Sequence, residues 1–191
     1  MERIDTNGIE GLWFLVVVAV GVTVFGCGNH VSTHNVPMLD GVELVTDVYR
    51  ERLTGSYPTI VMRTPYGREG NEYAADDFVE RGYAAVTQDI RGTGDSGGEF
   101  VMFVNDGWGL TGDGRATVEW AAEQTWSDGR VGLWGGSALA IAALLAAGSA
   151  PPSLGCAFSL AGTGDLFHHF AYQGGALREE LCVYWHTMME E

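Results

Sequence analysis

A serine that follows two glycines is the residue of this chain best suited to chemistry. The stretch from Val131 to Ala140 reads VGLWGGSALA, so Ser137 lies between a short apolar run and an Ala- and Leu-rich helical pattern. A serine hydroxyl becomes a useful nucleophile when a sharp strand-to-helix turn holds it clear of the backbone beside a base. Gly135 and Gly136 permit such a turn because they carry no Cβ. The spacing therefore predicts a nucleophile elbow, which is typical of acyl transfer.

The helix expected after Ser137 adds a second chemical element. The first turn of a helix leaves backbone N–H groups without partners, and these can donate to a developing oxyanion. A second interpretation of Ser137 stays open on the residues alone, because serine is also favoured as an ordinary helix N-cap. The nucleophile is the favoured interpretation, since two glycines and a strand-like run precede the serine.

Alternating strand and helix patterns supply the scaffold for this turn. The sequence predicts strands with β-branched or apolar content and helices with an apolar face. The strands are expected at 42–49, 59–63, 83–88, 130–134 and 156–160, and the helices at 72–81, 112–124 and 138–147. Such alternation predicts an α/β protein with a doubly wound, mostly parallel sheet and helices on both faces.

Three segments are expected to meet at one edge of this sheet. Functional residues of parallel sheets gather at the carboxyl ends of the strands, which places 63–67, 89–92 and 135–137 together. The glycine-rich piece at 91–99 superficially resembles a phosphate-binding loop. It has no P-loop lysine and does not open a helix at the dinucleotide-binding spacing, so it predicts a structural loop and no nucleotide cofactor.

Composition narrows the class of protein and of partner. The 191 residues are 46% hydrophobic and 11% aromatic, which predicts a folded core. The formal net charge is −15, from 25 acidic residues against 10 arginines and no lysine. Nucleic acid is excluded as an expected partner, because phosphate binding needs clustered positive charge.

The first 27 residues differ from the rest of the chain. Residues 11–26 are uncharged and apolar, and Cys27 follows them, which predicts a signal peptide or lipoprotein signal at 1–27 and an exported protein. A lipid anchor at Cys27 would be the sole membrane attachment. The flank departs from a signal peptide, since three acidic residues outnumber Arg3. An uncleaved anchor, or a misassigned start with a cytoplasmic location, stays open.

The cysteines and histidines predict neither a disulfide scaffold nor a metal site. With Cys27 set aside, Cys156 and Cys182 could form at most one disulfide. Cys156 lies in an apolar run and is expected to be a small core residue, and Cys182 lacks the spaced partners of a zinc site. His30 and His34 are expected in a linker that follows the signal segment.

Several motifs in a fixed order resemble one known family. They are VPMLDGVELVTDVY at 36–49, RTPYG at 63–67, QDIRG at 88–92, GEF at 98–100, EW at 119–120 and WSDGRVG at 126–132. From residue 36 to 178 the chain resembles the X-Pro dipeptidyl-peptidase and cocaine-esterase-like (CocE/NonD-type) serine hydrolases. The resemblance implies an α/β-hydrolase fold with an inserted helical cap, usually followed by a jelly-roll domain, and cleavage of esters, amides or dipeptides after proline.

The same resemblance implies roles for three residues. Ser137 is the nucleophile, the backbone N–H of Ala138 is one oxyanion donor, and the hydroxyl of Tyr66 is the other. Without the resemblance, Tyr66 would be interpreted as a turn tyrosine packed beside Pro65. The family pattern has tyrosine and glycine where this chain has Ala138 and Ala140, and the loss of the aromatic side chain puts substrate preference in doubt.

A serine nucleophile also needs a base and an orienting carboxylate, which follow the serine in this fold. Downstream of Ser137 the candidates are Asp165, His168, His169 and His186. The family's catalytic Asp and His come beyond the cap, so the chain is expected to be truncated before the end of the sheet. A local pair of Asp165 with His168 or His169 is disfavoured, because their helix would turn them away from the elbow.

The sequence therefore predicts the N-terminal part of an α/β-hydrolase domain at 28–165 and the beginning of a helical cap at 166–191. The predicted function is hydrolysis of a small-molecule ester or a short peptide through an acyl-enzyme at Ser137, with no cofactor and with this fragment inactive alone. The alternative is a non-catalytic exported or lipid-anchored binding protein on a degenerate hydrolase scaffold. Oligomeric state is not defined.

Overall fold

The computed structural model describes residues 29–107 and 112–190. The predicted signal segment at 1–27, including Cys27, lies outside these residues, so it stays a prediction. Within the described ranges, every helix is too short or too polar to span a lipid bilayer.

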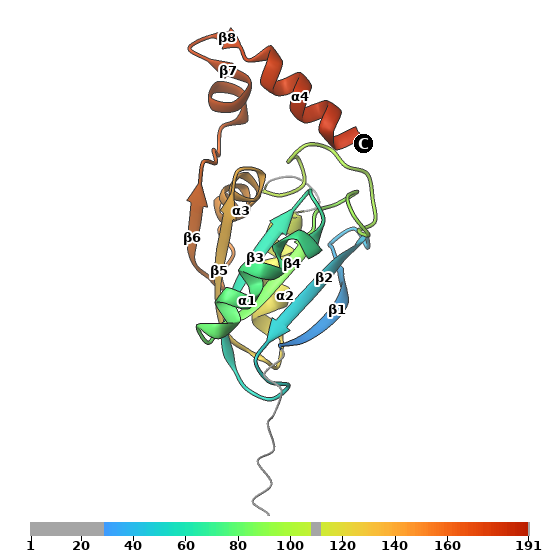
Figure 1. The fold of residues 1–191 in the computed structure, drawn as a ribbon, viewed down its shortest axis with the longest axis vertical. Coiled ribbons are helices and arrows are strands. Elements are labelled where there is room, and N and C mark those ends of the chain that lie inside the picture. Colours follow the sequence, from blue (N-terminus) through green and yellow to red (C-terminus); the bar gives the residue numbers. More distant parts are fainter. Residues whose placement is uncertain (1–28, 108–111, 191) are drawn as a thin grey trace, which may run out of the picture.

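One sheet of six strands forms the centre of the molecule (Figure 1). The strands are β1 (His30–Pro37), β2 (Glu43–Arg50), β3 (Tyr57–Thr64), β4 (Ala84–Asp89), β5 (Ser127–Gly136) and β6 (Leu154–Leu160). They lie in the order β1-β2-β4-β3-β5-β6. β4, β3, β5 and β6 are parallel to one another, whereas β2 runs antiparallel to both of its neighbours, β1 and β4. The mostly parallel sheet predicted from the sequence is therefore confirmed.

The first strand of the sheet was not predicted from the sequence. His30 and His34 were expected in a linker, but both lie in β1, which pairs with the whole length of β2. The expectation was wrong because β1 is an edge strand rich in polar residues, so its apolar alternation is weak. Val36, which is fully buried, is its main anchor in the core. The His34 ring also packs edge-on against Trp120, with ring centroids 5.6 Å apart.

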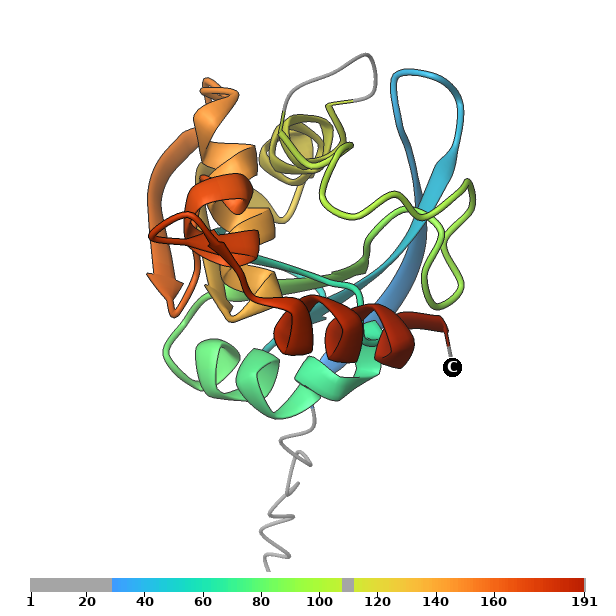
Figure 2. The same cartoon turned by 90° about the horizontal axis from the view of Figure 1, so that it is seen from above.

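Helices cover both faces of the sheet, as predicted (Figure 2). Helix α1 (Glu72–Glu80) lies on one face, and helices α2 (Asp113–Glu123) and α3 (Ala138–Gly148) lie on the other. Adjacent residues of β3 show the alternation, because Val61 belongs to the apolar cluster of α2 and α3, whereas Met62 belongs to that of α1. Successive side chains of a strand point to opposite faces, so one strand supports both layers.

Strand β6 is more exposed than its apolar sequence suggests. Cys156 is exposed, so the expectation that it is a core residue was wrong. Among the described residues, β6 pairs with β5 alone, and Phe158 and Leu160 are also exposed. An apolar run signals a strand, but it does not reveal whether other elements cover both faces of that strand.

The C-terminal residues 166–190, called the cap segment below, lie over the carboxyl edge of the sheet (Figures 1 and 2). They form a π-helical turn, η2 (Leu166–Ala171), a small hairpin of β7 (Tyr172–Gln173) and β8 (Ala176–Leu177), and helix α4 (Glu179–Glu190). Trp185 of α4 is buried and stacks on Phe103, with ring centroids 5.6 Å apart. This aromatic contact ties the cap segment to the sheet domain.

Candidate active site

Ser137 forms a strained turn between β5 and α3. Its φ is 55° and its ψ is −122°, a conformation that non-glycine residues rarely adopt. The side chain is exposed, and the backbone N–H donates to the Leu160 carbonyl at 2.9 Å, which fixes the turn against β6. This is the backbone geometry of the predicted nucleophile elbow, and it is not that of a relaxed N-cap, since the side chain makes no capping hydrogen bond.

Two glycines allow the turn to pack this closely. A Cβ on Gly135 would lie 2.3 Å from the backbone carbon of Leu139, and one on Gly162 would lie 2.5 Å from the Cβ of Ala140. Ala140 is fully buried, so the small residue in place of the family's glycine is accommodated against Gly162. The elbow therefore depends on the absence of side chains at these two positions.

The two predicted oxyanion donors lie at the same edge of the sheet as Ser137. Ala138 is the first residue of α3, where the helix offers no acceptor for its N–H. Tyr66 follows the carboxyl end of β3, the strand next to β5. Its backbone N–H donates to Thr64 Oγ1 at 3.0 Å, and its half-exposed side chain reaches towards the cap segment.

The hydroxyl of Tyr66 has a defined partner in the cap segment. Trp185 Nε1 donates to the Tyr66 oxygen at 2.9 Å. An indole N–H can only donate, so the tyrosine oxygen is the acceptor and its own proton stays available for another acceptor. Tyr66 is thus held by α4 rather than packed as a simple turn residue, and sequence reasoning did not identify Trp185.

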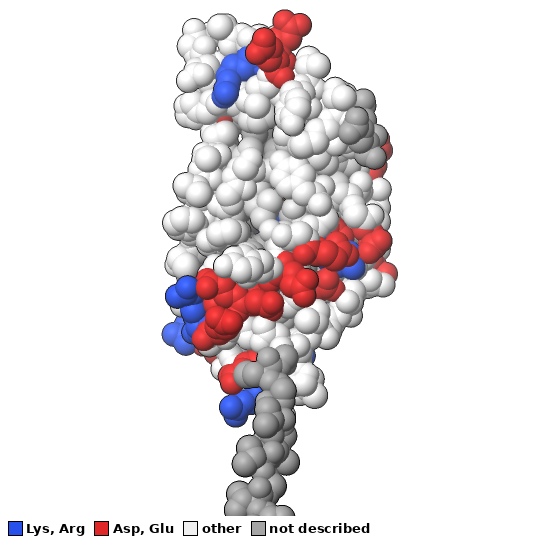
Figure 3. All heavy atoms as spheres, viewed as in Figure 1, with Lys and Arg blue, Asp and Glu red and all other residues white. Residues whose placement is uncertain are grey.

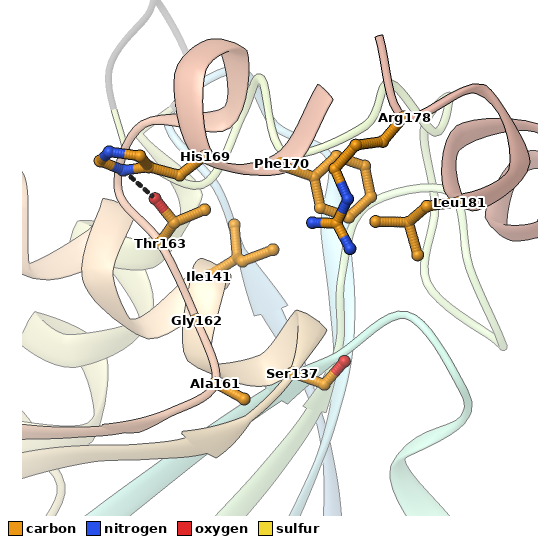
Figure 4. Close-up of a pocket in the computed structure, with 9 residues that line it drawn as sticks. All are labelled: Ser137, Ile141, Ala161, Gly162, Thr163, His169, Phe170, Arg178 and Leu181. Carbon is orange, nitrogen blue, oxygen red and sulfur yellow. Dashed lines mark hydrogen bonds between the residues drawn. The ribbon is translucent and has the colours of Figure 1, made fainter. Parts of the chain in front are cut away.

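The candidate local base is directed away from the elbow. His168 Nδ1 and Asp165 Oδ2 lie 2.8 Å apart, and both side chains are exposed. The backbone N–H and the ring of His168 lower the pKa of Asp165. His169 bonds to Thr163 Oγ1 at 3.2 Å, and Figure 4 shows its ring turned away from Ser137. Among the described residues, no side chain accepts a hydrogen bond from the Ser137 hydroxyl. These residues also contain no cluster of three metal-ligating side chains.

A pocket of about 380 Å³ opens above Ser137 (Figure 4). Ser137 and Ile141 of the sheet domain form one wall, and Phe170, Arg178 and Leu181 of the cap segment form the opposite wall. The Arg178 side chain extends into the space above Ser137. In the sequence, Arg178 is one residue of the predicted cap at 166–191, and nothing local to it signals that the tertiary fold turns it towards the elbow.

A buried ion network supports the edge of the sheet next to the pocket. Arg68 donates from Nε to Asp47 at 2.9 Å and from Nη1 to Asp89 at 2.8 Å. The backbone N–H of Arg68 also donates to Asp89, at 2.6 Å. Asp89 is fully buried, so the guanidinium compensates for the cost of burying its charge.

The glycine-rich loop at 91–99 is held by the same kind of contact. Arg91 donates to Asp113 of α2 at 2.7 Å and to Asp40 of the β1–β2 turn at 2.9 Å. Ser96 Oγ donates to the Asp89 carbonyl at 2.8 Å. These contacts agree with the predicted structural loop, because the polar groups of the loop bind other parts of the protein.

Arg63, the first residue of the RTPYG motif, also has a structural position. It is buried, donates to Gln88 Oε1 at 2.7 Å and pairs with Asp106. Burial raises the pKa of Asp106, and the charge of Arg63 acts in the opposite direction. The motif therefore places a buried cation three residues before Tyr66 and links β3 to β4.

The mostly parallel sheet and the strand-to-helix turn at Ser137 define the chain as an α/β-hydrolase scaffold. The family model described as X-Pro dipeptidyl-peptidase (S15 family) matches residues 40–191. The chain therefore belongs to this family. A curated relative, cocaine esterase from Rhodococcus sp. (strain MB1 Bresler), is 35% identical over an alignment of 173 residues, and the match covers 85% of this chain and 29% of that protein.

Solved structures show the same fold. A CocE/NonD family hydrolase from Staphylococcus aureus has a TM-score of 0.73 at 22% identity and covers 84% of this chain and 32% of that chain. An α-amino acid ester hydrolase has a TM-score of 0.61 at 26% identity and covers 75% of this chain and 28% of that chain. The chain spans about three tenths of the length of these relatives.

Proposed function

We propose that this protein hydrolyses ester or amide bonds through an acyl-enzyme at Ser137. The observation that carries the proposal is the strained, exposed Ser137 on a strand-to-helix turn, beside an open pocket. Strain of this kind persists where the surrounding structure holds it for a purpose. Membership of the S15 family and the esterase relative support the same chemistry.

The proposed reaction has two balanced steps. Ser137 Oγ bonds to the carbonyl carbon of the substrate, its proton passes through a general base to the leaving alkoxide or amine, and the alcohol or amine departs. Water then attacks the acyl-serine, gives its proton to the same base and releases the acid, while Ser137 regains its proton. The N–H of Ala138 and the hydroxyl of Tyr66 hold the oxyanion in both steps.

The base and its carboxylate are proposed to come from residues outside 1–191. This rests on the positions of two of the candidate histidines, because His168 pairs with Asp165 at the surface and His169 bonds to Thr163. Residues 1–191 expressed alone are accordingly expected not to turn over esters. Ester and X-Pro peptide substrates both fit the proposal, since the family is described as X-Pro dipeptidyl-peptidase and the curated relative is an esterase.

The test uses a fluorophosphonate probe on the full-length protein encoded by the gene. The expected result is labelling of the protein and loss of labelling in Ser137→Ala. Loss of a serine nucleophile lowers kcat by about a million-fold in a comparable serine hydrolase, so ester turnover should fall to background. Labelling that persists in Ser137→Ala would place the nucleophile elsewhere and refute the assignment.

The second candidate is a binding protein that keeps the scaffold without catalysis. The observation in its favour is that no described side chain accepts a hydrogen bond from Ser137. It predicts that the full-length, folded protein is neither labelled by the probe nor active on 4-nitrophenyl esters, although it binds ligands in the pocket. The same labelling experiment therefore separates the two candidates.

A further inference from the structure

Arg178 differs from the other arginines that the structure describes. Arg52, Arg63, Arg68, Arg81, Arg91 and Arg130 pair with carboxylates, Arg115 donates to backbone carbonyls, and Arg50 lies over the Trp126 ring. Within residues 29–107 and 112–190, the Arg178 guanidinium has no hydrogen bond, ion pair or ring contact. In a chain with 25 acidic residues and 10 arginines, an unpaired guanidinium is an exception that needs a reason.

The position of this guanidinium points to a ligand. Arg178 lies directly before α4 and extends into the pocket above Ser137 (Figure 4). Phe170 and Leu181 lie on either side of it, and Ile141 lies across the pocket. Arg178 is exposed, so its guanidinium is accessible to an anionic group that enters the pocket.

The charges around the pocket select the same kind of ligand. None of the residues that line the Ser137 pocket carries a carboxylate, although the net charge of the chain is −15. Arg178 also lines a second pocket with Glu179 and Glu180, so the absence of carboxylates applies to the side that faces Ser137. On the face shown in Figure 3, the acidic side chains form a band across the half of the molecule that holds α1. Between that band and the cap segment, the surface in this view is almost free of acidic side chains.

We propose that Arg178 binds a carboxylate of the substrate, so that the site prefers esters or amides that carry a negative charge. Arginine is suited to this role because its planar fork can donate two parallel hydrogen bonds to one carboxylate. Arg178 is thus a specificity-determining residue in the reaction proposed for Ser137, and this inference rests on that proposed function. The carboxylate belongs either to the acyl group or to the leaving group, and two substrate pairs distinguish these sources.

The first experiment measures kcat/KM of the full-length protein on matched esters. For the acyl side, the mono-4-nitrophenyl ester of adipic acid is compared with 4-nitrophenyl hexanoate. For the leaving group, 4-acetoxybenzoate is compared with its methyl ester. The wild-type protein should prefer the charged member of one pair, and Arg178→Gln should lower that preference by about 10- to 100-fold, the effect of losing a hydrogen bond between charged groups.

Two variants serve as controls. Arg178→Lys keeps the charge but loses the fork, so it should retain part of the preference. Arg52→Gln removes an equal charge from an exposed arginine paired with Glu51, outside the pocket, and should leave the preference unchanged. No preference for charged esters in the wild type, or equal losses on charged and neutral esters in Arg178→Gln, would overturn the proposal.

A binding measurement separates this inference from the catalytic one. In the Ser137→Ala background, calorimetry compares monomethyl adipate and 4-acetoxybenzoate with their neutral methyl esters, with and without Arg178→Gln. If at least one charged compound binds through Arg178 but the wild-type protein shows neither turnover nor labelling, the hydrolase proposal fails and the anion site stands. If neutral esters turn over but Arg178→Gln changes neither selectivity nor binding, the anion site fails and the hydrolase proposal stands.

Discussion

The arginines of the sheet domain and the arginine of the cap segment have opposite surroundings. Arg63, Arg68 and Arg91 are each more than nine-tenths buried, and each pairs with a carboxylate from another part of the fold. Arg178 is exposed and has no partner among the described residues. Arginine therefore has two different roles in this protein. The buried guanidinium groups stabilise the edge of the sheet, and the unpaired guanidinium of Arg178 is available to a ligand.

The backbone strain at Ser137 shows the same difference between the site and the elements that support it. Ser137 keeps an unfavourable backbone conformation, and the elements around it are close enough to exclude a side chain at Gly135 or Gly162. The ion network of Arg68, Asp47 and Asp89 lies at the neighbouring strand ends. Rigid surroundings of this kind allow a strained turn to persist, since contacts elsewhere in the fold offset the cost of the strain.

The largest effect on stability is expected from Arg68→Met. It leaves the buried carboxylates of Asp47 and Asp89 without their main cation, and breaking a buried pair in this way costs about 3–5 kcal/mol. Urea unfolding of the full-length protein would measure the loss. Arg81→Gln, which removes an exposed pair with Asp77, is the matched control and should leave the unfolding midpoint nearly unchanged. Equal losses of unfolding free energy in Arg68→Met and Arg81→Gln would show that the buried ion network stabilises the fold no more than an exposed ion pair does.

Removal of the Tyr66 hydroxyl tests the site rather than its support. Tyr66→Phe should lower kcat by about 100- to 1000-fold, the effect of losing one oxyanion donor, while the urea unfolding midpoint stays close to that of the wild type. Ester kinetics and unfolding of the same preparation would check both parts. An increase in KM with kcat unchanged would indicate that Tyr66 contacts the substrate without stabilising the oxyanion.

The hydrogen bond from Trp185 to Tyr66, which joins the cap segment to the sheet domain, is expected to have a smaller effect on kcat. Trp185→Phe keeps an aromatic ring against Phe103 but removes the donor to Tyr66, so kcat should fall about 3- to 10-fold, as expected for one neutral hydrogen bond. In the Tyr66→Phe background the same change should have no further effect on kcat, because the two residues act through one bond. Additive losses would show that Trp185 acts by another route.

The smallest effect is expected for Asp40→Asn, on the melting temperature at acid pH. Hydrogen bonds from Arg91 lower the pKa of Asp40 below its usual value of 3.8. A lowered folded-state pKa contributes stability above the unfolded pKa, and this contribution is lost as pH falls through the folded value. Asp40→Asn should therefore flatten the decrease in melting temperature below about pH 4. If the melting temperatures of the wild type and of the variant fall in parallel as the pH is lowered, the ionised Asp40 does not contribute to stability.

Much of the scaffold could be predicted from local pattern. The strand and helix alternation, the Gly-Gly-Ser turn and the order of the motifs predicted the sheet and the elbow to within a few residues. Cys156 and β1 were misjudged for physical reasons. Burial of Cys156 depends on which elements cover β6, and the pairing of β1 depends on hydrogen bonds that a polar edge strand makes with β2.

By itself the sequence determined the family and the strand-to-helix turn at Ser137, because the order of the motifs, Gly135 and the strand and helix patterns on either side are all local features of the chain. The tertiary structure decided which distant groups meet that serine. Trp185 reaches Tyr66 across 119 positions of sequence, and Arg178 enters the Ser137 pocket from the cap segment. Contacts between residues so far apart in the sequence depend on how the chain folds back over the sheet. Local periodicity and composition do not predict that path.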